Sequence, residues 1–150
     1  MDPLSITVSV VTLLQATNAI VLLCYNYANA AKGAARTIGG VIDDMKTLRS
    51  VLESLEQLLR SNQDTELSDT ILLTTITTLC NQEDGPIAKE LKTLEEKLRP
   101  PGWASQDGSR RKALIQFLIW PLKESETTKT LQNIERLKST LELVLTVDNT

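Results

Sequence analysis

An uncharged run at the N-terminus limits the possible folds more than any other feature of this sequence. From Pro3 to Ala31, 29 residues contain no Asp, Glu, Lys or Arg. A helix of that length can span a bilayer. A helix that is apolar on nearly every side is either buried in a bundle or reaches into lipid. The run is diluted by Ser, Thr, Asn and Gln, which makes it less apolar than a typical membrane span. The only charge before it is the acidic Asp2, whereas a signal peptide begins with positive charge. We therefore expect neither a signal peptide nor a constitutive transmembrane helix.

The rest of the chain repeats apolar side chains with a helical period. Between residues 41 and 59 they follow one another at spacings of three and four. Gly85-Pro86 interrupts a later stretch because proline has no backbone N–H. The pattern predicts helices near 4–31, 38–61, 67–98 with a break at about 81–86, 109–121 and 124–147. Asp2-Pro3 should open the first helix, and Gly39-Gly40 should lie near the start of the second. A strand over 70–79, rich in Thr and Ile, is the main local alternative.

Composition agrees with an all-α fold. The chain has 150 residues, of which 41% are hydrophobic and only 3% aromatic, so Leu, Ile, Val and Ala must fill the core of one domain. We predict an up-and-down bundle of four to five helices over residues 1–150. Its abrupt end suggests the N-terminal part of a longer protein. The residues expected in the core are Leu48, Leu52, Leu55, Trp120, Leu137 and Leu141.

The sequence offers little for catalysis. It has no histidine, which removes Ser-His and Cys-His pairs and histidine-containing zinc sites. Adjacent carboxylates such as Asp43-Asp44 point about 100° apart on a helix. No glycine-rich phosphate loop is present, and Cys24 and Cys80 lie in apolar stretches where buried, reduced thiols are expected. We expect no enzyme activity, no catalytic residue, no cofactor and no metal. The net charge of −3 does not favour nucleic acid.

One basic cluster stands out. Arg110, Arg111 and Lys112 would lie in the first turn of a helix, where cations oppose the helix dipole. With Trp103 they are candidate contacts for an acidic partner or for anionic lipid. The alternatives are an ordinary solvated loop edge for the cations and a structural cover over the bundle end for Trp103.

Both ends of the chain carry motifs of a known family. The opening, Met1-Asp2-Pro3-Leu4-Ser5-Ile6-Thr7-Val8-Ser9-Val10-Val11-Thr12-Leu13-Leu14-Gln15, resembles the start of fungal STAND proteins, in which an N-terminal domain precedes a NACHT nucleotide-binding module and repeats. Trp120-Pro121-Leu122-Lys123-Glu124 and the segment from Leu131 to Leu141 look like the bend and closing helix of that domain. The domain belongs with the HeLo-like domains, which are similar to the four-helix bundle of the necroptosis executioner MLKL.

The resemblance implies a function. It implies an effector or signalling domain of a fungal NLR-like protein, acting in regulated cell death, innate immunity or heterokaryon incompatibility. The expected partners are other copies of itself, a NACHT or other sensor module, and anionic membrane lipids. The expected location is cytoplasmic, moving to the plasma membrane on activation. The N-terminal helix would target the membrane, covered at rest by the helices beginning near 38 and 124. Its candidate membrane-targeting residues are Leu4, Ile6, Val10, Leu13, Leu14 and Val21. The alternative is a protein-binding adaptor or regulatory scaffold without membrane activity.

Overall fold

The computed structural model of the chain describes residues 3–61, 70–99 and 120–148, and this part is all α. The elements are α1 (Pro3–Ala30), the short 3-10 helix η1 (Lys32–Ala34), α2 (Ala35–Ser61), α3 (Thr70–Cys80), α4 (Pro86–Leu98) and α6 (Glu124–Asp148). No strand occurs among these residues. The helical bundle expected from the sequence is therefore confirmed.

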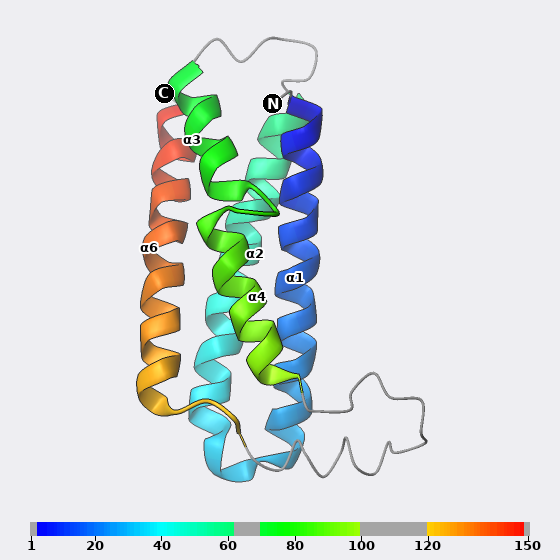
Figure 1. Cartoon of the computed structure of the whole chain (residues 1–150), viewed down its shortest axis with the longest axis vertical. Coiled ribbons are helices and arrows are strands. Elements are labelled where there is room, and N and C mark those ends of the chain that lie inside the picture. The colour runs from blue at the N-terminus through cyan, green and yellow to red at the C-terminus, as the bar shows by residue number, and fades with distance from the viewer. Residues whose placement is uncertain (1–2, 62–69, 100–119, 149–150) are drawn as a thin grey trace, which may run out of the picture.

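The long helices lie side by side, and successive ones run in opposite directions, with α3 and α4 together forming one broken rod (Figure 1). α1 packs mainly on α2 and α4, while α6 packs on α2 and on the α3–α4 rod. α1 and α6 therefore occupy opposite corners of the bundle.

This arrangement corrects one expectation. The helix beginning near 124 was expected to cover α1, but α3 and α4 take that place. The three-residue η1 connects α1 to α2, and these two helices pack against each other. Each rod of a four-rod bundle has two close neighbours and one diagonal partner. The second neighbour of α1 is the broken rod, which leaves α6 on the diagonal.

The break between α3 and α4 falls where the sequence predicts it, at residues 81–85. The Asn81 side-chain oxygen accepts hydrogen bonds from the backbone N–H groups of Glu83 and Asp84, at 2.9 and 3.3 Å. The Gly85 N–H donates to the Asn81 carbonyl, and a Cβ at Gly85 would lie 2.5 Å from that oxygen. Only glycine, which has no Cβ, allows the backbone to come this close to Asn81. Pro86 then opens α4, a position that proline favours. Because 70–80 is helical, the strand alternative was wrong.

Two boundaries differ from the predicted ones. α2 begins at Ala35, directly after η1, so Gly39-Gly40 lies inside its second turn rather than at its start. Trp120 and Pro121 are not helical, which shortens the predicted helix 109–121 at its end. The rest of that helix, and the predicted start of the third helix at 67, lie outside the described residues.

The core is aliphatic. Leu48, Leu52, Leu55 and Leu141 are fully buried, as predicted. Leu137 is only partly buried, because it lines a surface groove between α4 and α6 beside Pro86 and Asn133. The expected burial is thus only partly met at Leu137. It is also only partly met at Trp120, which is partly buried against the core.

Candidate functional site

α1 is the candidate functional element. Within the described residues, Ser5–Ala30 is the one segment whose length and composition would allow it to cross a membrane, and half of its most apolar stretch is buried inside the bundle. The core helix of a soluble protein passes the same criterion. The faces of α1 therefore have to be compared one by one.

The inner face of α1 belongs to the core. Ile6, Val10, Leu13 and Val21 are buried, and Leu14 is partly buried against them. The side chain of Leu4 lies outside the described residues. In the resting bundle, four of the six candidate membrane-targeting side chains are thus buried and a fifth, Leu14, is partly buried.

The outer face of α1 carries no charge. Exposed side chains recur along the helix at spacings of three and four, which places them on one stripe. This outer stripe consists of Ser5, Val8, Thr12, Gln15, Asn18, Leu22, Tyr25 and Asn29. The exposed face of α2, by contrast, includes Asp43, Lys46, Glu53 and Arg60.

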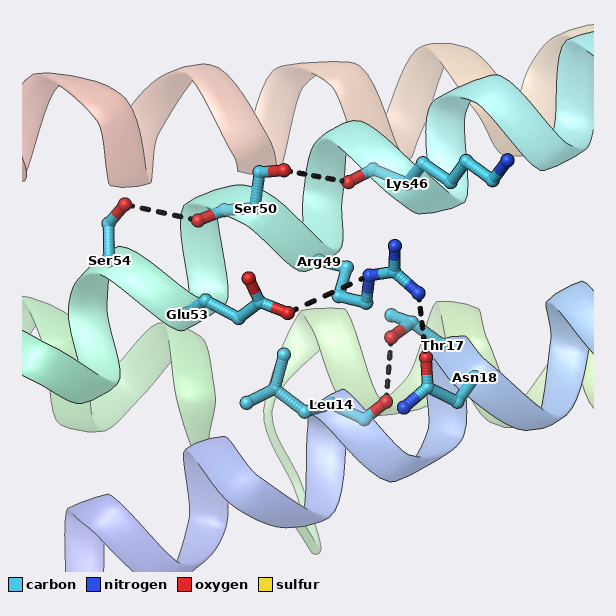
Figure 2. Close-up of polar contacts among 8 residues, drawn as sticks. All are labelled: Leu14, Thr17, Asn18, Lys46, Arg49, Ser50, Glu53 and Ser54. Carbon is cyan, nitrogen blue, oxygen red and sulfur yellow. Dashed lines mark hydrogen bonds and ion pairs between the residues drawn. The ribbon is translucent and has the colours of Figure 1, made fainter.

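Two cations of α2 reach the outer stripe. Arg49 donates a hydrogen bond from Nη1 to the Asn18 side-chain oxygen at 3.1 Å, and its Nε lies 3.7 Å from the Glu53 carboxylate (Figure 2). Lys46 Nζ lies 5.7 Å from the centre of the Tyr25 ring, within the range of a cation–π interaction. Arg49 and Lys46 therefore attach the middle and the C-terminal half of α1 to α2.

A buried contact joins α1 to α4. The Tyr27 hydroxyl donates a hydrogen bond to the Leu98 carbonyl at 2.6 Å. Burial, with a smaller contribution from Cys24, raises the pKa of Tyr27 to about 12, so the hydroxyl keeps its proton. Trp120 meets the Tyr27 ring edge to face, with centroids 5.2 Å apart. The indole Nε1 of Trp120 is buried without a hydrogen-bond partner in the described part of the chain.

The cysteines are core residues. Cys24 and Cys80 are free and fully buried, and burial raises the pKa of each thiol to about 12. A protonated, buried thiol is neither a nucleophile nor a metal ligand. No group of His, Cys, Asp and Glu side chains suited to a metal ion occurs among the described residues.

A polar seam between α2 and α6 was not anticipated from the sequence. Lys138 forms an ion pair with Glu135 at 2.7 Å and approaches the Thr47 hydroxyl at 3.4 Å. Burial raises the pKa of the Asp44 carboxyl, with further increases from Glu135 and Asp43 and a decrease from Lys138. Residues so far apart in sequence gave no signal of this contact, because each fits an ordinary helix surface.

The second candidate site lies elsewhere. Trp103, Arg110, Arg111 and Lys112 fall outside the described residues, so their contact with lipid or a partner stays a prediction.

Comparison with known proteins gave no match to a family model, to a curated protein or to a solved structure.

Proposed function

We propose that this domain is an effector that acts by self-assembly and membrane targeting through α1, in regulated cell death or self/non-self recognition. The observation that carries the proposal is the absence of charge on every face of α1, the outer stripe included. A helix that only completes a soluble core needs one apolar face and normally carries charge on the other. A helix that leaves water needs to be free of charge on both.

The buried face supports the same proposal. While α1 lies in the bundle, the apolar side chains of its inner face are covered by α2 and α4. Release exposes them to water, at a free-energy cost of about 25 cal/mol per Å² of apolar area. That cost falls when α1 enters lipid or packs against another copy. The resemblance to the HeLo-like domains supports the cell-death assignment, and a sensor module such as NACHT would supply the trigger.

Dye leakage from vesicles tests the proposal. The purified chain should release dye from vesicles that contain anionic phospholipid. Gln15→Lys places a charge near the middle of Ser5–Ala30 at an exposed position, so the resting fold is kept. The charge costs ~2.5–3.5 kcal/mol at a bilayer centre, which corresponds to a loss of leakage of roughly two orders of magnitude.

Ser139→Lys on the exposed face of α6 is the matched control, and it should leak like the unmodified chain. Equal thermal stability of both variants would show that folding is unchanged. If the intact chain releases no dye, or if Gln15→Lys leaks like Ser139→Lys, the membrane proposal fails. A protein-binding adaptor, with the outer stripe as its docking face, then replaces it.

A further inference from the structure

A hollow lies between α1 and α4, two helices that pack side by side (Figure 1). Its volume is about 550 Å³, within the range of pockets that hold small molecules. The floor is apolar: Leu13 and Ala16 come from α1, and Ala88 and Leu91 come from α4. Both alanines are partly buried, and they leave room that longer side chains would fill. We call this hollow the α1–α4 cavity.

The apolar floor is short. It covers residues 13–16 of α1 and residues 88–91 of α4, one helical turn of each, or roughly 5 Å along either helix. Gln82 and Glu83 border the floor at one end, and Glu95 borders it at the other. A compact ring fits such a floor, whereas an extended acyl chain would run out over charged and polar side chains.

The rim of the cavity carries positive charge that is not fully neutralised. Lys89 and Lys92 lie three residues apart on α4, so their side chains are neighbours. The ion pairs among the described residues involve neither of them. The Glu95 carboxylate is engaged by Arg99 at 2.6 Å, whereas Glu83 has no such partner in the described part of the chain. Two lysines therefore face one free carboxylate at this rim.

This combination indicates the chemistry of a ligand. An apolar floor beside two lysines fits a molecule with a compact apolar body and one negative group. A carboxylate accepts hydrogen bonds from both ammonium groups, which are stronger than bonds between neutral groups. A cationic ligand would meet two like charges at the rim, and a neutral one would leave both lysines without a partner.

We propose that the α1–α4 cavity binds a small aromatic carboxylate, and that the bound molecule holds α1 in the bundle. Because the cavity is built from both helices, the ligand binds only while α1 is seated, and its binding stabilises that state. The binding site stands independently of the proposed function. Its regulatory purpose rests on that function, since holding α1 opposes its release.

Isothermal titration of the full chain with naphthoate, in the absence of vesicles, tests the site. Binding should saturate at a single site and raise Tm. Naphthamide has the same ring system without the charge and should bind roughly tenfold more weakly. Decanoate, a flexible acyl carboxylate, should also bind more weakly than naphthoate. Equal or tighter binding of naphthamide or decanoate would overturn the proposed class of ligand.

The two lysines of the rim test the site from the side of the protein. The double variant Lys89→Ala/Lys92→Ala should weaken naphthoate binding roughly tenfold, because both cations that face the carboxylate are lost. Lys97→Ala/Lys129→Ala is the matched control: it removes two exposed lysines outside the cavity lining, with the same change of net charge. It should bind naphthoate like the unmodified chain. Equal affinities of the two double variants would place the binding elsewhere and overturn the proposal.

Filling the floor tests the position of the ring. Ala88→Leu should weaken naphthoate binding by roughly tenfold or more, because its side chain occupies the space of the ring. Ala88→Ser keeps the side chain small and should still bind. Circular dichroism and thermal melts should show that both variants are folded. A folded Ala88→Leu chain that binds naphthoate with unchanged affinity would contradict the assignment to this cavity.

Dye leakage separates the hold on α1 from the proposed function. Naphthoate should slow leakage by the intact chain more than leakage by Lys89→Ala/Lys92→Ala. Naphthoate binding without any leakage supports the site and refutes the effector proposal. Leakage that naphthoate does not slow, despite binding, refutes the hold on α1 and leaves the effector proposal standing. Leakage without any naphthoate binding refutes the site itself.

Discussion

Burial controls the reactivity of the two cysteine thiols in this domain. Cys24 and Cys80 stay protonated well above neutral pH, because burial raises the pKa of both thiols to about 12. The native chain should therefore react very slowly with a thiol reagent at pH 8, whereas both cysteines should react at once in denaturant. Mass spectrometry of alkylated protein checks this. Rapid labelling of Cys24 in the folded chain would show that α1 is not seated in the bundle.

Leu52 tests the packing of the core. It lies mid-stripe on α2 and is fully buried. Leu52→Ala should lower the free energy of unfolding by ~2–5 kcal/mol, through lost burial and the cavity left behind. Chemical denaturation measures the change. Leu143→Ala, at an exposed position, should change stability by less than about 0.5 kcal/mol. Equal losses at both positions would contradict the packing described.

The core residues also show what helical periodicity in the sequence could not predict. Leu48, Leu52, Leu55 and Leu141 were identified as core residues because they lie in the middle of their apolar stripes. Leu137 lies in such a stripe too, but it meets the open groove beside Pro86, which depends on how α4 and α6 are set together. Helical period identifies an inward face, and the depth of burial along it depends on the neighbouring helix.

Among the elements, the seam between α2 and α6 gives a pH-dependent prediction. The folded state raises the pKa of Asp44, chiefly through burial. Such a carboxyl stabilises the folded state most when it is protonated. This contribution to stability is lost as pH rises from the pKa of the unfolded state to the higher pKa of the folded state. At pH 7 the charged Asp44 therefore opposes folding.

Asp44→Asn should consequently raise Tm at pH 7, and the gain should disappear at acid pH, where the native carboxyl is protonated. Asp43→Asn makes the same change of charge on the exposed neighbour and should give a smaller gain. Thermal melts across the acid range distinguish these results. A lower Tm for Asp44→Asn at pH 7 would mean that attraction to Lys138 outweighs burial.

The order of the helices and the break between α3 and α4 could be predicted from the sequence, because the signals for them are local. Spacings of three and four marked α2, and Gly85-Pro86 marked the break, because the signal for each lies within a few residues. The partners of α1 were not predictable, since they depend on which corner of the bundle the broken rod occupies. The outer stripe was visible only in part: the sequence showed a run without charge, but only the fold separates the buried Val21 from the exposed Leu22.

At the scale of the whole molecule, α1 has two roles to reconcile. It supplies core side chains on its inner face and an uncharged stripe on its outer face. Stability requires the helix to stay, and the proposed function requires it to leave. Arg49, Lys46 and the Tyr27–Leu98 hydrogen bond all attach it within residues 18–27. Release therefore has to break these contacts along with the apolar packing.

The position of α1 on a membrane tests this account most directly. Because both native thiols are buried, a cysteine introduced at the exposed Gln15 can be labelled selectively with an environment-sensitive fluorophore. A second chain labelled at Ser139 on α6 reports on the rest of the bundle. With anionic vesicles, the label at position 15 should brighten and be quenched by lipids that carry a quencher deep in their acyl chains, while the label at 139 should not. If the label at 15 stays in water while the vesicles leak, or if both labels respond alike, α1 is not the element that enters the membrane.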